Sequence, residues 1–133
     1  MMSVERFKHY KLGIPEIDKE HFELFELLNA VEVAIINGDY KSAKEHFDDF
    51  FIKLDIHGIN EEEMMNLIEY PFMKIHVSQH PESTMQMLKY RNKREDEMKF
   101  LTVTKIESLF ADHIDKDDSQ YVPYYLKFYA SLN

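Results

Sequence analysis

The sequence contains no cysteine, and only three glycines and four prolines occur among its 133 residues. The absence of cysteine excludes disulfide bonds, thiolate metal sites and cysteine nucleophiles. Few glycines and prolines, together with many Glu, Lys, Leu, Met and Phe residues, favour long helices and few turns. A chain of this length is expected to form a single domain over residues 1–133.

Long hydrophobic runs and an excess of positive charge are also missing. No segment approaches the roughly 18 apolar residues that a membrane span requires, and the first residues lack the apolar region of a secretion signal. We therefore expect a cytoplasmic protein with no membrane partner. The net charge of −9 at pH 7 argues against nucleic acid or an anionic membrane surface as a partner.

Apolar residues recur at steps of three and four in four segments, which predicts four helices that each turn one face to a common core. Asn37-Gly38-Asp39 should end the first helix, because glycine adopts a left-handed conformation at low cost. Pro71 suits the first turn of the third helix. The sequence thus predicts an all-α fold. Its expected parts are an N-terminal arm over 1–16, helices over 17–37, 41–70, 71–90 and 97–114, and a tail with a short C-terminal helix over 119–133.

Two prolines bear on where these helices begin and end. Gly13 and Pro15 are expected to keep the N-terminal arm from forming a helix. Pro81 cannot donate a backbone hydrogen bond and disfavours helical geometry in the residue before it. We therefore expect a kink or a short break just after His80, followed by a further helical piece over about 83–90.

Polar residues interrupt the apolar faces at positions that should be buried. Glu61 lies one heptad after Leu54, where another apolar residue is expected. A single buried histidine is more often a hydrogen-bonded core residue than a metal ligand, and a buried carboxylate costs several kcal/mol unless it is paired or bound to metal. One shared metal site explains all the interrupting residues together. They are His21, His57, Glu61, His76, His80, His113 and Asp118.

The spacing of these residues favours two metal ions. His57 and Glu61 are four residues apart, as are His76 and His80, so each pair lies on one face of a helix. Imidazoles and carboxylates without sulfur suit Fe, Mn, Zn or Cu rather than Ca or Mg. Seven ligands exceed what one ion accepts, so two ions that share the carboxylates give the most economical count. His46 lies about 16 Å from His57 along the helix and is interpreted as structural.

The pattern resembles the hemerythrin family, in particular its single-domain bacterial type. The resemblance covers about residues 7–120. The matching segments are GIPEIDKEH, which ends in His21; HGINEEEMM, with His57 and Glu61; YPFMKIHVSQH, with His76 and His80; and LFADHIDKDD, with His113 and Asp118.

The resemblance implies an up-down four-helix bundle around a non-haem di-iron centre. One iron would be held by three histidines and the other by two, with both carboxylates and an oxo or hydroxo group bridging them. O2 would bind reversibly, as a hydroperoxide, at the iron that has the open position. The implied ligands are His76, His80 and His113 for the first iron, His21 and His57 for the second, and Glu61 and Asp118 for the bridges.

Two residues of the expected oxygen pocket depart from the family pattern. Leu109 stands where the family often has tryptophan, and Phe110 stands where it commonly has leucine against bound oxygen. A phenyl ring at position 110 would narrow the pocket and alter oxygen affinity or autoxidation.

The favoured function is oxygen binding without net chemistry, for carriage, storage, delivery or sensing. The alternatives are a di-iron redox enzyme, such as an oxidase, a peroxidase or a nitric-oxide-handling protein, and a sensory module that acts through a separate partner. The Glu-x-x-His pairs of ferritin-like di-iron enzymes are absent from the sequence, which favours a protein that is not an enzyme. The aromatic tail is expected to cover the bundle rather than join subunits, so a monomer is favoured.

Overall fold

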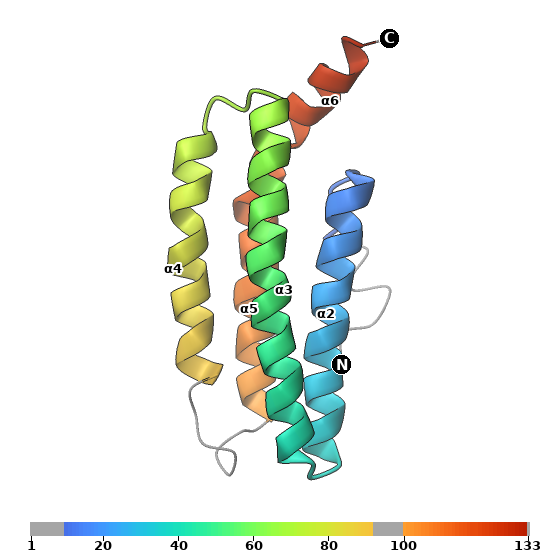
Figure 1. Ribbon diagram of the computed structural model, residues 1–133, viewed down its shortest axis with the longest axis vertical. Coiled ribbons are helices and arrows are strands. Elements are labelled where there is room, and N and C mark those ends of the chain that lie inside the picture. Colours follow the sequence, from blue (N-terminus) through green and yellow to red (C-terminus); the bar gives the residue numbers. More distant parts are fainter. Residues whose placement is uncertain (1–9, 92–99, 133) are drawn as a thin grey trace.

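The structure is a computed structural model, and it describes residues 10–91 and 100–132. Four long helices lie side by side along one axis (Figure 1). The second and the fourth of them, α3 and α5, each contact both α2 and α4, so every helix has two neighbours. The described part of the chain is all-helical. Its elements are α2 (Pro15–Ile36), α3 (Tyr40–Leu67), α4 (Met73–Arg91), α5 (Phe100–Lys116), the 3-10 helix η2 (Asp118–Tyr121) and α6 (Val122–Ala130).

The first helix begins earlier than its sequence predicted. Pro15 occupies the first turn of α2, where its missing N–H would have had no helical partner in any case. The backbone N–H groups of Leu12 and Gly13 donate to the Asp18 carboxylate at 2.7 and 3.0 Å, which fixes the approach of the chain. The expectation that Pro15 prevents a helix is therefore wrong.

The turn between α2 and α3 follows the predicted stop. Gly38 has a φ of +72°, a left-handed conformation that glycine adopts at low cost. Asp39 then caps α3, because its carboxylate accepts hydrogen bonds from the Ser42 N–H at 3.1 Å and from the Ser42 hydroxyl at 2.8 Å. This capping satisfies one of the donors that a helix start leaves without a partner.

The third long helix, α4, continues through its proline. Pro81 lies inside α4, and the break expected just after His80 is absent (Figure 1). The Val77 carbonyl loses its donor four residues on, because proline has no N–H. One missing hydrogen bond does not end the helix, since Met87 beyond the proline is buried in the core that α4 shares with its neighbours.

The core consists of two apolar clusters with the predicted site residues between them. On α3 the chain passes from Phe50 in the larger cluster to Met65 in the smaller one. On α2 it passes from Ile17 in the smaller cluster to Leu24 in the larger one. The polar residues of both helices lie between these points, so apolar packing encloses the site at both ends.

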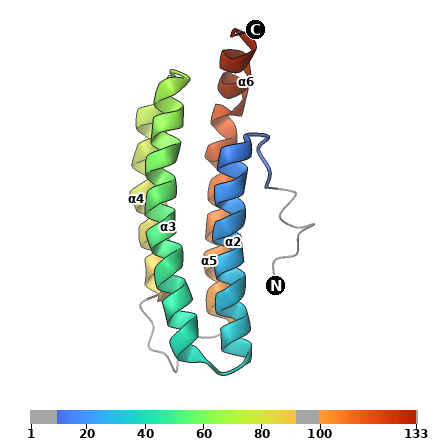
Figure 2. The ribbon, with the colours of Figure 1, turned by 45° about the vertical axis from the view of Figure 1, so that its right-hand side comes forward.

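The C-terminal helix is the least buried element. Figures 1 and 2 show α6 extending past the end of the bundle, and none of its residues is fully buried. Tyr125 and Phe128 pack against the smaller cluster, while Leu126 is 57% exposed. None of the helices in the described ranges has both the length and the apolar character needed to cross a membrane.

Parts of three expected segments lie outside the described residues. These are residues 1–9 of the N-terminal arm, 97–99 of the fourth expected helix and 133 of the C-terminal tail. At its other end α5 runs to Lys116, two residues beyond the predicted end, and the acidic segment that follows forms η2.

Candidate metal centre

The seven residues singled out from the sequence lie together in the interior of the bundle. Their ligand atoms form two groups, and within each group all of these atoms lie within 4.8 Å of one another. Glu61 and Asp118 belong to both groups. The contributors are His21 from α2, His57 and Glu61 from α3, His76 and His80 from α4, His113 from α5 and Asp118 from η2.

The first group contains two imidazoles. The Nε2 atoms of His21 and His57 are 3.1 Å apart. His21 Nε2 lies 3.2 Å from Asp118 Oδ2, and His57 Nε2 lies 3.0 Å from Glu61 Oε2. Four ligand atoms from three elements therefore face one point.

The second group contains three imidazoles. His76 Nε2 contacts Glu61 Oε1 and lies 3.0 Å from Asp118 Oδ1. His80 Nε2 is 3.0 Å from Glu61 Oε1, and His113 Nε2 is 3.2 Å from Asp118 Oδ1. Each carboxylate thus turns one oxygen to this group and the other oxygen to the first group, which is the arrangement that a bridging ligand requires.

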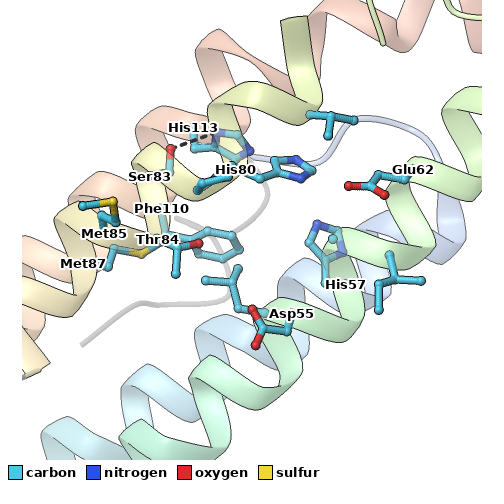
Figure 3. A pocket seen from close by; sticks show the side chains of 15 residues that line it. Asp55, His57, Glu62, His80, Ser83, Thr84, Met85, Met87, Phe110 and His113 are labelled. Atoms are coloured by element: carbon cyan, nitrogen blue, oxygen red, sulfur yellow. Dashed lines mark hydrogen bonds between the residues drawn. The ribbon is translucent and has the colours of Figure 1, made fainter. Parts of the chain in front are cut away.

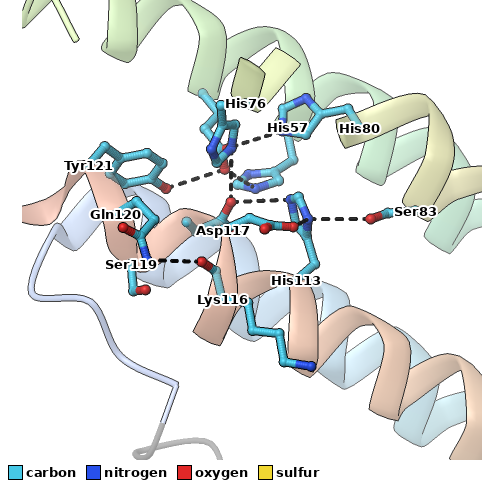
Figure 4. A network of polar contacts seen from close by, with 12 residues as sticks. His57, His76, His80, Ser83, His113, Lys116, Asp117, Ser119, Gln120 and Tyr121 are labelled. Atoms are coloured by element: carbon cyan, nitrogen blue, oxygen red, sulfur yellow. Dashed lines mark hydrogen bonds and ion pairs between the residues drawn. The ribbon is translucent and has the colours of Figure 1, made fainter. Parts of the chain in front are cut away.

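Two further carboxylates hold the outer nitrogens of two imidazoles. His57 Nδ1 donates to Glu20 Oε1 at 2.8 Å, and Asn60 Nδ2 donates to Glu20 Oε2 at 2.5 Å. His113 Nδ1 lies 2.8 Å from Asp117 Oδ2 (Figure 4). A neutral imidazole that donates through Nδ1 keeps its lone pair on Nε2, so these contacts orient the lone pairs of both rings toward the centre.

Two hydroxyl groups complete the polar surroundings. The Tyr121 hydroxyl donates to Glu61 Oε2 at 3.3 Å, and Tyr121 is fully buried (Figure 4). Burial and the neighbouring Asp118 and Glu61 raise the pKa of Tyr121 well above its usual value, so it remains a donor at neutral pH. Ser83 Oγ lies 3.4 Å from His113 Nδ1.

The two shared carboxylates make the centre favourable for positive charge. Burial alone would lower the pKa of His57, but hydrogen bonds with Glu20 and Glu61 raise this pKa to about 10. Burial also opposes protonation of His76, whose contacts with Asp118 and Glu61 raise its pKa to about 9. Conversely, burial would raise the pKa of Asp118, and the neighbouring imidazoles hold it below its usual value. Either bound protons or bound metal ions can supply the positive charge that the two shared carboxylates favour.

The buried donor set fits a metal ion. Neither oxygen of Asp118 accepts a well-aligned hydrogen bond, although imidazole nitrogens lie 3.0 to 3.2 Å away, and Asp118 is fully buried. A buried carboxylate without such partners is costly unless a cation compensates it. Imidazole nitrogens and carboxylate oxygens are the donors that iron, manganese, zinc and copper accept. The residues present therefore match a pair of such ions.

The two residues predicted for the oxygen pocket lie at different places. Phe110 is 1% exposed, and its ring packs edge-on against His21 with the centroids 5.6 Å apart. It also lines a pocket of about 460 Å³ between α3 and α4 that reaches the rings of His57, His80 and His113 (Figure 3). Leu109 packs against the larger apolar cluster and does not line this pocket.

The residues that surround the candidate ligands were not predicted from the sequence. Asp117 could have been found, because it lies four residues after His113 on the same helical face. Glu20 reaches His57 across 37 positions of the chain, and Tyr121 reaches Glu61 across 60. No local spacing links residues that far apart.

Comparison with known proteins finds one match, which covers most of the chain. The family model described as "Hemerythrin HHE cation binding domain" matches residues 12–125. A search of curated proteins and a search of solved structures find no match. The matched range contains all seven clustered residues and confirms the family resemblance that the sequence motifs indicated. The chain belongs to the hemerythrin HHE cation-binding domain family.

Proposed function

We propose that this protein holds two iron ions in a non-haem centre and binds O2 reversibly, to carry, store, deliver or sense it. The observation that carries the proposal is the pair of ligand groups that share Glu61 and Asp118. The group with His21 and His57 has one imidazole fewer than the other, which supports an open position for oxygen on that side.

Each part of the chain would contribute differently to this function. The five imidazoles and the two shared carboxylates would hold the ions, and iron bound there would supply the electrons that oxygen binding needs. Glu20 and Asp117 hold the Nδ1 atoms of His57 and His113, so the rings keep their orientation when oxygen binds and leaves. Tyr121 donates to Glu61 and keeps that carboxylate in place.

An apolar wall would protect the open side from water. The ring of Phe110 lies with its centroid 4.9 Å from that of Phe25 and 5.9 Å from that of Phe50, next to His21. All three phenylalanines are buried. They offer no proton donor, and proton donors promote the loss of bound oxygen in a reduced form, so this wall favours reversible binding.

The remaining parts of the proposal concern the whole protein. We propose that it performs no net chemistry, acts in the cytoplasm as a monomer, and has O2 as its partner rather than nucleic acid or a membrane. We also propose that its helices form an up-down bundle. The order of colours along the four long helices in Figure 1 supports alternating directions.

The optical spectrum of the iron-loaded protein tests oxygen binding. The protein is reduced without air, oxygenated and then degassed. A charge-transfer band that appears with oxygen and disappears on degassing is the expected result. Direct conversion to a stable diferric spectrum would contradict reversible binding.

Metal content tests the ligand assignment. His57→Ala removes an imidazole from the two-histidine group, so the metal bound per chain should fall toward half while most of the helix content remains. His46→Ala is the matched control, because His46 lies on the same helix and belongs to neither ligand group. Full metal content in the His57→Ala protein would refute the assignment.

One observation favours a second candidate, a di-iron redox enzyme. The pocket of about 460 Å³ beside three of the histidines has far more room than a diatomic molecule needs, so an organic substrate could reach the centre. The irreversible outcome of the optical experiment, together with turnover of an added reductant, would support this candidate.

A further inference from the structure

We propose that the pocket between α3 and α4 binds a small organic cation, an ammonium ion that carries an apolar body. All residues that line the pocket belong to this chain. The proposal concerns a ligand other than O2, and it does not depend on oxygen binding. Figure 3 shows the pocket with its lining side chains.

The size of the pocket suits a small organic molecule. Its volume of about 460 Å³ falls within the roughly 300 to 1,000 Å³ that is typical of small-molecule sites. Gly58 helps to keep its inner end open, because a Cβ added there would lie 3.7 Å from His80 Nδ1. Any larger side chain at position 58 would extend into the space in front of that ring.

The walls of the pocket are mainly apolar. Leu54 and Phe110 line it from α3 and α5, and Val77 and Met87 line it from α4. Methionine side chains adapt their shape to different apolar partners, and Met85 adds a second one that is 64% exposed. These surfaces would contact the apolar body of a ligand.

Besides the imidazoles of His57, His80 and His113, which lie against Glu61 and Asp118, the ionisable residues of the lining are acidic. Asp55 and Glu62 both line the pocket, and no lysine or arginine is among the lining residues in the described part of the chain. The two acids are seven residues apart on α3, about 10 Å along the helix axis, and Gly58 lies between them. An ammonium group at this edge would gain from either carboxylate, and from the net charge of −9 of the whole chain.

Hydroxyl groups add acceptors to these carboxylates. The hydroxyls of Ser83 and Thr84 also belong to the lining. Apart from the imidazoles, the polar side chains of the lining are thus carboxylates and hydroxyls, which can accept from an N–H donor with positive charge.

A ligand in this pocket would lie against the metal centre. The side chains of His80 and His113 are 19% and 9% exposed, and both line the pocket. An occupant would cover these rings on that side and reduce the access of solvent to the centre.

Calorimetric titration with two probes of similar shape and opposite charge tests the proposal. The probes are 2-phenylethylamine and 3-phenylpropionate, each added to the full-length chain as purified and to the same chain after iron removal. The amine should bind in both forms, and the anion should bind at least about tenfold more weakly. Equal binding of the two probes, or no binding of the amine, would overturn the proposal. Neither outcome depends on whether the protein binds oxygen.

Variants locate the binding within the pocket. The double variant Asp55→Asn/Glu62→Gln should weaken amine binding by about threefold to tenfold, the range expected for partly exposed charge pairs. Glu63→Gln is the matched control, since Glu63 is exposed on the same helix and does not line the pocket.

Thr84→Trp tests the apolar part, because the larger ring would fill the space and should abolish amine binding. Circular dichroism establishes that each variant keeps its helix content. Unchanged amine binding in both the double variant and a folded Thr84→Trp protein would place the amine elsewhere and refute the proposal.

Discussion

Single residues outside the ligand set determine how the ligands face the centre. His57 presents Nε2 to the first ligand group because its Nδ1 donates to Glu20, which is itself held by Asn60. Without an acceptor at Nδ1, the imidazole could place its proton on Nε2 or rotate, and either change would remove a lone pair from the site. Asp117 has the same relation to His113.

Replacing Glu20 should therefore weaken metal binding although Glu20 is not a ligand. Glu20→Ala is expected to lower metal affinity by about 10- to 100-fold, the usual effect of losing such a partner. Glu20→Gln should cost less, because its amide oxygen can still accept from Nδ1. Competition with a chromophoric chelator measures the affinity.

The control for this experiment is Glu16→Ala, an exposed acid at the start of the same helix. It should bind metal as tightly as the unaltered chain. If Glu20→Ala also retained full affinity, the outer hydrogen bond would have no role in holding the site.

The candidate metal ligands could be predicted from the sequence, whereas the residues that hydrogen-bond to them could not. His57 and Glu61 stand out because each interrupts an apolar face at a four-residue step. Glu20 gives no such signal, because an acid on the partly exposed side of a helix is ordinary, and its contact to His57 exists only after α2 and α3 have packed. The buried hydroxyl of Tyr121 was likewise hidden in an aromatic segment.

At the scale of elements, α4 shows tertiary packing overriding local preference. Proline is strongly disfavoured inside a helix, and the sequence alone therefore predicted a break after His80. The helix continues because Met87 in its second half is buried in the shared core, and that burial offsets the loss of one hydrogen bond. The early start of α2 has a different cause, since Pro15 is tolerated in a first turn.

Removing the proline should stabilise the fold. Pro81→Ala restores an N–H donor to the Val77 carbonyl and should raise the free energy of unfolding by up to about 3 kcal/mol, less the part that proline contributes by restricting the unfolded chain. Denaturation with urea, followed by circular dichroism, measures the change.

Pro71→Ala provides the comparison, because Pro71 lies in the turn between α3 and α4; the prediction that it occupies the first turn of the third helix is wrong, since α4 begins at Met73. This variant should leave stability unchanged or slightly lower. A loss of stability in Pro81→Ala would mean that the proline itself shapes α4 favourably, contrary to the argument from the missing donor.

At the scale of the whole molecule, the metal centre links folding to pH. Two carboxylates and five imidazoles meet inside a domain of 133 residues, so their charge must be balanced either by protons or by metal. Metal ions at this candidate site would bind the unprotonated imidazoles, and their binding energy would add to the stability of the fold. As the pH rises, fewer protons remain to balance the carboxylate charge, whereas metal binding becomes stronger.

The stabilisation provided by iron should therefore grow as the pH rises from 6.5 toward 9. The pKa of His76 is raised from 6.5 to about 9, and that of His57 to about 10. A group whose pKa is raised by folding contributes its full stability below pH 6.5 and loses it as the pH rises through the folded value.

The metal-free chain should thus become less stable across this window, while metal binding strengthens as fewer protons compete. We expect the difference in Tm between the iron-loaded and metal-free chains, measured by calorimetry, to widen steadily. The His46→Ala protein should show the same widening, whereas a constant or shrinking difference in the unaltered chain would mean that the imidazoles do not exchange protons for metal.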